Sequence, residues 1–302
     1  MWKRDQSRSG GESRWLSLRG SRLILTVRDS LVAICRGSLM LETVTPVRFH
    51  APVSSGRNRP ARVECETADG ALVEVIAKFA GLCDRGEVAL AIEVVGACLA
   101  ADLGLPIPKP YLLNIDQAWV CTIPDATYRA AVGRSGAVAF GSTNIGSGYR
   151  SWTGNDRLPA QLVPVALAIF CFDALINNID RRDGNPNCLF KTPQLRIFDH
   201  ELSFVYKGVL GWRSPWLVGA LAPFASPGQH IFHAKLKGQT IDLAPVRAAW
   251  SRLSDARLDE YKRVVPSAWT NVGTAVGDAI SLIQGVRDNV DGALAEVRRV
   301  LT

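Results

Sequence analysis

The sequence predicts an α+β chain in which a small β-rich part comes first and a larger, mainly helical part follows. An alternating segment, 61–66, and a segment rich in β-branched residues, 72–79, flank the turn Asp69-Gly70 and are typical of a β-hairpin. Near the other end, apolar residues recur at helical spacing from 275 to 301. With 302 residues and 47% hydrophobic content, the chain is long and apolar enough to form a real core.

The β-rich part is predicted to carry one helix between Gly86 and Leu103. Its apolar residues have a helical period, and Gly104 followed by Pro106 provides a stop. We expect three further strands, at 44–49, 109–114 and 118–122, with the last two joined by a turn. The first part would then span residues 40–123, with a hinge at Pro124-Asp125.

The second part, residues 124–302, is predicted to be mainly helical. The stretch up to Gly154 is rich in Gly, Ser and Thr and is expected to be an exposed, mobile loop. A buried helix is expected from about 158 to 178, followed by a hairpin of 188–191 and 195–198. The apolar stripe of the C-terminal helices is expected to pack in the core, with a partner interface as the alternative.

Three oxygen-bearing residues surround the predicted hairpin. Asp180 opens a loop, Asn185 follows five positions later, and Asp199 comes after the return strand. Pairing the two strands brings Asn185 and Asp199 to the same end, with Asp180 on the same rim. Such a set suits phosphoryl transfer, because the first Asp can receive a hydroxyl proton while the Asn and the later Asp can hold magnesium on nucleotide phosphates.

Two alternatives apply to this motif. Asp, Asn, Gly and Pro are common in surface loops, so the eight residues of 180–187 do not by themselves establish a site. Asn187 also competes with Asn185 for the metal-binding role. The spacing from Asp180 favours Asn185, and the following strand would also tolerate Asn187.

A lysine and a glutamate upstream strengthen the interpretation. Lys78 lies near the end of a predicted strand, and Glu93 lies within the helix that follows. Such a pair can form an ion pair that aims the ammonium at nucleotide phosphates. An ordinary strand-end lysine and a solvated helix residue are the alternatives for either residue alone.

The chain resembles the HipA-like kinases, a bacterial family, over residues from about 40 to 235. Asp-Arg-x-x-x-Asn also resembles phosphatidylinositol kinases, which share the wider kinase fold. The stretches that match the HipA-like kinases are Ser55-Gly56-Arg57-Asn58-Arg59-Pro60, Ala77-Lys78-Phe79, Ile92-Glu93, Leu103-Gly104-Leu105-Pro106-Ile107-Pro108, Phe140-Gly141-Ser142, Asn178-Ile179-Asp180-Arg181 through Asn185-Pro186-Asn187, and Phe198-Asp199-His200.

The resemblance implies a two-lobed protein-kinase-like fold and transfer of the ATP γ-phosphate, usually to a Ser or Thr of a protein. By position it implies that Lys78 binds the α/β-phosphates with Glu93 as its partner. It also implies Asp180 as the catalytic acid/base, and Asn185 and Asp199 as magnesium ligands.

The chain departs from kinase patterns in two places. The segment around Ser55-Gly56 contains one Gly instead of a Gly-rich loop, although its backbone N–H groups and Arg57 or Arg59 could still cover phosphates. After Asp199 comes His200-Glu201 with no Gly, so a flipping activation segment is not expected.

Bulk properties set the expected partners and location. The net charge is +7, but residues 1–39 hold eight Lys/Arg against three Asp/Glu, so +5 of the total lies there. We interpret residues 1–39 as a basic extension that is either disordered or not translated, with Met40 as the alternative start. The rest is not basic enough to predict nucleic-acid binding.

No membrane association or secreted disulfide framework is expected. The longest apolar run, 162–172, is too short for a bilayer, and the seven cysteines form no Cys-x-x-Cys pair. We therefore expect a cytoplasmic protein. His230 and His233 have the spacing of one helix face, but without a third ligand nearby a surface loop is favoured over a metal site.

Three functions remain open at this point. The favoured one is an ATP- and Mg²⁺-dependent Ser/Thr protein kinase, with a protein substrate and room for an antitoxin or regulatory partner. The second is a kinase of a lipid or small-molecule hydroxyl, because such loops select the phosphate chemistry and not the acceptor. The third is a catalytically weak nucleotide-binding interaction module, which the intact set of five residues argues against.

Overall fold

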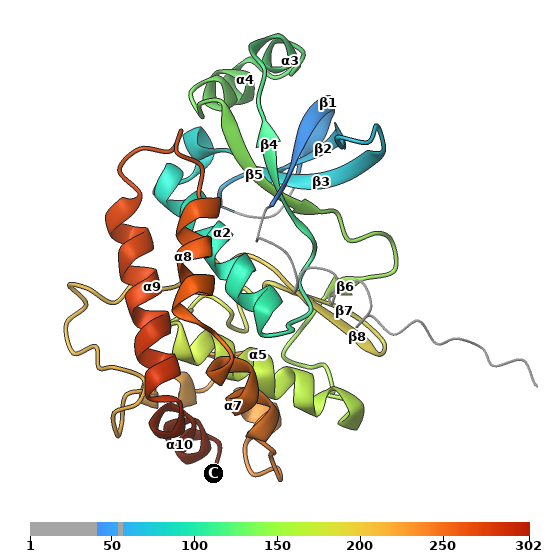
Figure 1. The fold of residues 1–302 in the computed structure, drawn as a ribbon. Coiled ribbons are helices and arrows are strands. Elements are labelled where there is room, and N and C mark those ends of the chain that lie inside the picture. The colour runs from blue at the N-terminus through green and yellow to red at the C-terminus, as the bar shows by residue number, and fades with distance from the viewer. Residues whose placement is uncertain (1–40, 54–56) are drawn as a thin grey trace, which may run out of the picture. The chain divides into compact units, whose positions relative to one another are not determined.

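The computed structural model describes residues 41–53 and 57–302, and its fold is drawn in Figure 1. The basic extension predicted at 1–39, and with it the alternative start at Met40, lies outside the described residues. So do Ser55 and Gly56, two of the predicted nucleotide-binding residues.

The first part of the described chain is a closed five-stranded barrel in the order β1-β2-β3-β5-β4. Neighbouring strands are antiparallel, except that β1 and β4 run parallel. The alternating pattern of β2 buries Val63, which pairs with Val75 of β3 and belongs to the same buried core as Leu113. The predicted hairpin is confirmed. The strands are β1 (Glu42–Pro52), β2 (Ala61–Glu66), β3 (Leu72–Lys78), β4 (Pro110–Asn114) and β5 (Val138–Thr143).

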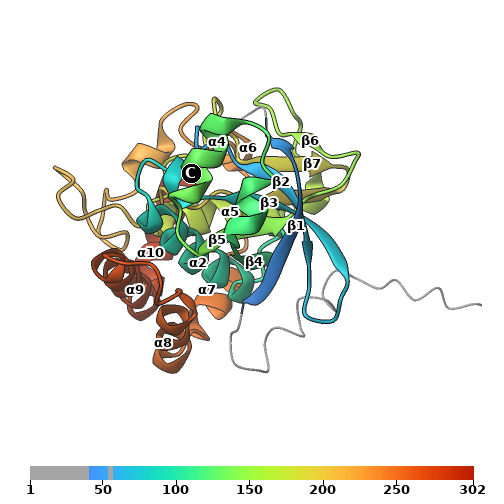
Figure 2. The same ribbon diagram turned by 90° about the horizontal axis from the view of Figure 1, so that it is seen from above.

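The predicted helix of the first part is confirmed as α2 (Glu87–Asp102), which follows the short 3-10 helix η2 (Ala80–Leu82). It ends as the sequence indicates, because Gly104 adopts φ 73°, a left-handed conformation that favours glycine. From Ala89 to Ala100 every residue of α2 is buried. The helix packs against β5, α8 and α9, as Figure 2 shows from above.

The predictions for residues 116–143 are wrong in three respects. Residues 118–122 do not form a strand, because Asp116 accepts a hydrogen bond from the Ala118 N–H and caps a helix, α3 (Gln117–Cys121). The expected hinge at Pro124-Asp125 instead starts α4 (Ala126–Gly133), capped by Asp125. The expected mobile loop thus contains a helix and strand β5, so a division at residue 123 separates β5 from the barrel to which it belongs.

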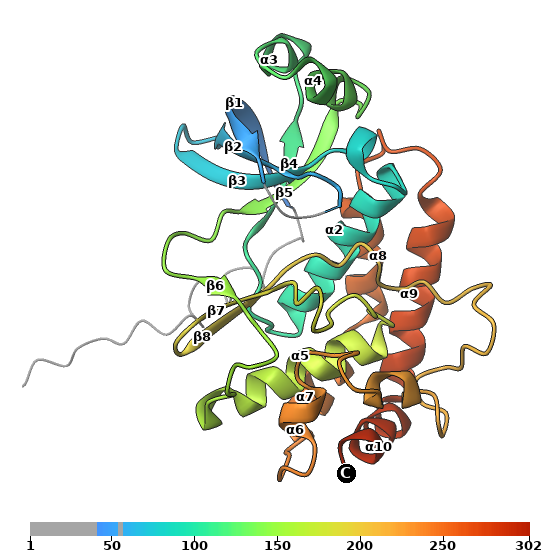
Figure 3. The ribbon, with the colours of Figure 1, turned by 180° about the vertical axis from the view of Figure 1, so that it is seen from behind.

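The second part is mainly helical and carries one small sheet, which Figure 3 shows below the barrel. Strands β6, β7 and β8 pair antiparallel, which confirms the predicted hairpin. The helix expected from 158 is shorter than predicted and begins near Pro164, which suits a first helical turn. The elements are β6 (Arg150–Ser151), η3 (Ala160–Leu162), α5 (Val163–Leu175), β7 (Cys188–Lys191), β8 (Gln194–Ile197), η4 (Ala222–Ala225), α6 (His233–Leu236), α7 (Ala244–Ser251), α8 (Asp255–Val264), α9 (Gly273–Asp288) and α10 (Val290–Leu301).

The C-terminal stripe packs in the core, as predicted. Its members from Val276 to Leu301 are all buried, although the helix breaks at Asn289 into α9 and α10. The fold class is therefore confirmed as α+β, with a small β-rich lobe and a larger helical lobe. Among the described residues, no helix combines the length and the apolar character that a bilayer crossing requires.

Candidate active site

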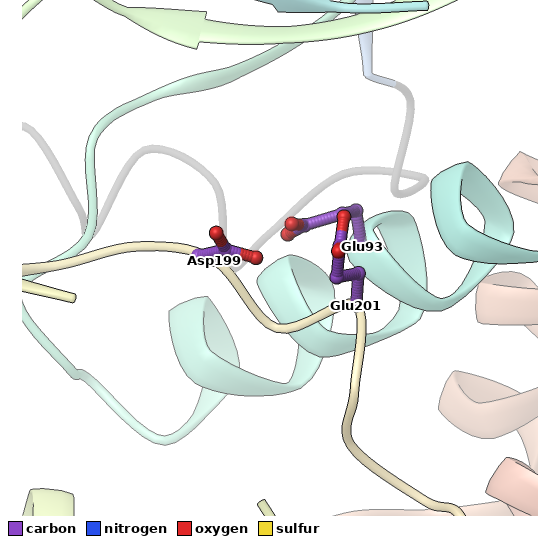
Figure 4. Close-up of side chains that lie close together, drawn as sticks. All are labelled: Glu93, Asp199 and Glu201. Atoms are coloured by element: carbon purple, nitrogen blue, oxygen red, sulfur yellow. The ribbon is translucent and has the colours of Figure 1, made fainter. Parts of the chain in front are cut away.

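Lys78, at the end of β3, is the cation at the centre of the candidate site. Its ammonium binds Glu93 of α2, Asp199 at 2.8 Å and Glu201 at 3.2 Å. Figure 4 shows the three acidic side chains converging from α2 and from the chain that follows β8. The structure thus brings together the three residues that the sequence proposed here and adds Glu201, which it did not.

The charges of this cluster depend on one another. Burial by itself would lower the pKa of Lys78, but Asp199, Glu93 and Glu201 raise it well above its usual value. Burial, with a smaller contribution from the carboxylates of Asp199 and Glu201, raises the pKa of Glu93 to about 7 against the opposing effect of Lys78. Burial also works to raise the pKa of Asp199, but Lys78 holds it below its usual value. Three carboxylates and one ammonium leave an excess of negative charge, which suits a site that accepts a further cation.

Asp199 is held in an uncommon backbone conformation. Its φ is 64°, in the left-handed region, which Asp tolerates better than most residues. The next residue, His200, donates its backbone N–H to the second carboxylate oxygen of Glu93 at 3.0 Å. One helical turn beyond Glu93 lies Gly96, where an added Cβ would come within 2.6 Å of the His200 Cβ. The close approach of α2 to the Asp199 segment therefore requires glycine.

Asp180 lies at the other side of the site with both candidate asparagines. One of its carboxylate oxygens accepts hydrogen bonds from the side-chain amides of Asn185 at 2.8 Å and Asn187 at 3.1 Å. The backbone carbonyl of Asn187 accepts from the N–H of Phe198 at 3.2 Å, directly before Asp199. The loop of Asp180 is thereby joined to the segment of Asp199. The choice between Asn185 and Asn187 as a metal ligand stays open, since both adjoin Asp180.

A fully buried ion cluster fixes this loop from behind. The guanidinium of Arg181 donates to Asp173 of α5 at 2.7 Å, to the carbonyl of Phe198 at 3.1 Å and to the carbonyl of Asn187. Asn178 donates to the other oxygen of Asp173 at 2.7 Å. The arginine next to the proposed acid/base thus connects the loop, the hairpin and α5.

His230 belongs to the same cluster. Its Nδ1 accepts from the backbone N–H of Phe232, so the ring proton lies on Nε2, which donates to Asp173 at 3.0 Å. Burial lowers its pKa, which keeps the ring neutral. His233 is also buried and bonds to the carbonyl of Val300. The favoured prediction of a surface loop is wrong for both histidines, because packing against α5 and α10 buries them.

Arg57 does not join the cluster around Lys78. Its guanidinium lies 2.7 Å from Asp84, and both side chains are exposed. Ser55 and Gly56 are outside the described residues, so phosphate binding by these three residues stays a prediction.

A small cavity adjoins the ion cluster between the two lobes. Apolar residues of the barrel and of β8 line it, together with Glu93 and Asp199. Its volume of about 20 Å³ holds no more than a water molecule. The cavity would have to widen before it could hold the purine ring of a nucleotide. The segment at Pro124-Asp125, the predicted hinge, is not part of this lining. The apolar lining residues are Ala97, Ile107, Pro108, Pro110, Phe140, Ile197 and Phe198.

Sequence reasoning missed the residues that support the site. Asp173, Arg181 and Glu201 carried only weak signals: an acid ending an apolar run, and charges beside the motif residues. His230 lies 57 positions beyond Asp173, and that contact could not be found from local spacing.

Comparison with known proteins adds the family. The model that describes HipA-like kinases matches residues 47–213. The chain belongs to the HipA-like kinase family. Membership makes it a phosphotransferase that uses a nucleotide. The match covers Lys78, Glu93, Asp180, Asn185, Asn187, Asp199 and Glu201, but not His230 or His233.

Other comparisons add little to this assignment. No curated protein matches the chain. Among solved structures, it is similar to the Helicobacter pylori proinflammatory kinase CtkA, at 9% identity over 87% of this chain and 99% of that chain, with a TM-score of 0.46. Nothing is inferred from that likeness, because both values are low.

Proposed function

We propose that this HipA-like kinase transfers the γ-phosphate of ATP, with magnesium, to a Ser or Thr hydroxyl of a protein. The observation that carries the proposal is the joining of Lys78, Glu93 and Asp199 in one ion cluster that is hydrogen-bonded, through the Phe198–Asn187 link, to the loop of Asp180. Transfer of this kind depends mainly on positioning and on electrostatic stabilisation.

In this proposal Lys78 binds the α- and β-phosphates of ATP. Glu93 is buried and holds the ammonium from the side of α2, so the lysine is positioned before nucleotide arrives. Asp199 and Glu201 now share that ammonium. Phosphate oxygens would take the place of Asp199 at this ammonium when nucleotide binds, and the carboxylate of Asp199 would then be available to the cation, while the contact of Glu201 is kept.

The residues present fit magnesium. Asp199 offers a carboxylate, and Asn185 and Asn187, which donate through their amide nitrogens, keep their amide oxygens for a cation. Hard oxygen donors of this kind suit magnesium together with phosphate. When bound, magnesium would neutralise charge on the phosphates.

Asp180 would accept the proton of the attacking hydroxyl. Its carboxylate accepts two amide hydrogen bonds, which fix its orientation, and its backbone N–H donates to Asn178, which is itself bonded to Asp173. A positioned general base contributes about 10²–10⁴-fold to the rate.

Asp180→Asn tests this assignment. Turnover with labelled ATP and magnesium should fall at least about a hundredfold, because the base is lost. The dissociation constant for nucleotide should change little, since Asp180 does not contact the Lys78 cluster. Steady-state transfer assays and binding of a fluorescent ATP analogue measure the two quantities.

Asp183→Asn is the matched control. Asp183 is an exposed carboxylate on the same loop, and no role is assigned to it. Turnover equal in wild type and Asp180→Asn would reject the proposal, as would equal losses in both variants. Recovery of the label in lipid or metabolite fractions, instead of on phosphoserine or phosphothreonine, would reject the protein acceptor.

A cytoplasmic location is part of the proposal. The six described cysteines are all free, and five of them are buried. Free buried thiols are usual where the compartment is reducing.

A further inference from the structure

Glu201 occupies an unusual place beside the proposed site. One carboxylate oxygen lies 3.2 Å from the ammonium of Lys78, and the other accepts a hydrogen bond from the side-chain amide of Asn58. Its backbone carbonyl accepts from Arg85 at 2.9 Å. Glu201 therefore joins β3, the chain that precedes β2 and the segment that carries Asp199. Figure 4 shows its side chain beside those of Glu93 and Asp199.

Asn58 belongs to a short segment, 57–60, that is anchored at three consecutive residues. Asn58 is only 6% exposed although it is polar, and Glu201 is the partner of its amide. The carbonyl of Arg59 accepts from the hydroxyl of Tyr128 at 2.8 Å, and that of Pro60 accepts from the N–H of Val53 at 2.7 Å. Of these three anchors, the Asn58 amide alone reaches the ion cluster.

We propose that Glu201 is a positioning residue that couples segment 57–60 to Lys78 through a single carboxylate. Its contacts hold segment 57–60, Lys78 and the Asp199 segment at fixed distances from one another. The nucleotide phosphates then bind to an arrangement that is already formed. This inference rests on the proposed function, since it assigns the coupling to nucleotide binding.

The chemistry explains why a glutamate stands here. Segment 57–60 contains no glycine, so it cannot wrap phosphates as closely as a Gly-rich loop and needs a fixed partner to keep its place. A carboxylate can accept from an amide and an ammonium at once, one on each oxygen. Neither glycine nor alanine at this position could do so.

The test is a double-mutant cycle of Asn58→Ala and Glu201→Ala, read as the KM for ATP, the kcat and the dissociation constant for a fluorescent ATP analogue. Each single variant should raise the KM and the dissociation constant about tenfold, the worth of one charge-assisted hydrogen bond. The double variant should raise them by no more than either single variant, because both remove the same coupling. The kcat should change less, since Asp180 is untouched.

Glu201→Gln separates the two contacts. Glutamine keeps an oxygen for Asn58 and loses the charge beside Lys78, so its effect should be smaller than that of Glu201→Ala. Glu64→Gln is the control, as Glu64 lies on the same barrel and pairs with an exposed arginine, Arg48, across 3.8 Å. Single-variant effects that multiply in the double variant would overturn the proposal. So would a lowered melting temperature without a change in KM or dissociation constant, because that marks a merely structural pair.

Failure of the proposed function is distinguishable from failure of this inference. If wild type binds the nucleotide analogue but transfers no phosphate, the function fails, and the cycle is still decided by the dissociation constants. If wild type does not bind the analogue, both are overturned.

Discussion

Two ion clusters lie on either side of the Asp199 segment, and they differ in burial and in charge balance. The cluster of Asp173, Arg181 and His230 is fully buried, and the guanidinium matches the carboxylate. In the cluster of Lys78, three carboxylates surround one ammonium, and the side chain of Asp199 is 26% exposed. The first cluster is complete without a ligand, whereas the second carries an excess negative charge and reaches solvent.

The difference shows that one cluster supports the Asp180 loop and the other is suited to binding the nucleotide. A buried ion pair is stabilised only when its hydrogen bonds are satisfied, and the Asp173 cluster meets this condition with Asn178 and backbone carbonyls. It can therefore hold the Asp180 loop rigid. The Lys78 cluster includes the partly exposed Asp199, whose place at the ammonium a nucleotide can take, as binding requires.

Arg181→Met should produce the largest loss of stability. It leaves the buried Asp173 without its cationic partner and removes the bonds to the carbonyls of Asn187 and Phe198. Breaking such a pair costs about 3–5 kcal/mol of unfolding free energy. Urea denaturation followed by circular dichroism measures it. A loss below about 1 kcal/mol would mean that this cluster is not the support of the loop.

Lys78→Met is the counterpart in the other cluster. It should abolish most phosphate transfer but lower the unfolding free energy less than Arg181→Met does. The reason is that Glu93, whose pKa is already raised to about 7, can take up a proton when the ammonium is removed. Equal losses of stability in the two variants would erase the distinction between the clusters.

Gly96→Ala should have the next largest effect, because it acts where the two clusters meet. The added methyl group would lie 2.6 Å from the His200 Cβ and push α2 away from the Asp199 segment. Overpacking of this kind costs about 1–3 kcal/mol. The affinity for nucleotide should fall as well, since Asp199 would move with respect to Lys78.

Gly277→Ala provides the control for this change. Gly277 lies in α9, and an added Cβ there would meet nothing within 4 Å. Alanine should leave stability unchanged or raise it slightly. If both alanine variants have the same free energy of unfolding in urea denaturation, the close approach of α2 to His200 at Gly96 does not require glycine.

The smallest expected effect is on pH dependence. Burial lowers the pKa of His230 in the folded protein, so below about pH 6.5 the unfolded chain takes up a proton that the folded chain resists. The contribution of His230 to stability is therefore present above that pH and is lost as the pH falls. Its share has a slope of at most about 1.4 kcal/mol per pH unit.

Melting temperatures of wild type and His230→Gln between pH 7 and 5 measure this contribution. The variant should show a flatter profile over that range. Parallel profiles would indicate that His230 titrates normally in the folded protein.

Much of the site could be predicted from the sequence because its signals are local. Asp180 and Asn185 lie in one loop whose residues rule out helix, and Asp199 follows a short hairpin. Lys78 and Glu93 are consecutive in the order strand, then helix. The failures fall at 116–125, where Asp116 and Asp125 act as helix caps although the flanking residues had suggested strands and a hinge.

By itself, the sequence determined which groups carry the proposed chemistry and in what order they occur, since loop composition and helical period depend on near neighbours. Only the tertiary structure decided what surrounds those groups. Glu201 reaches Asn58 across 143 positions, and His230 meets Asp173 across 57. Contacts of that range arise from the packing of α2, α5 and the barrel, and no local pattern encodes them.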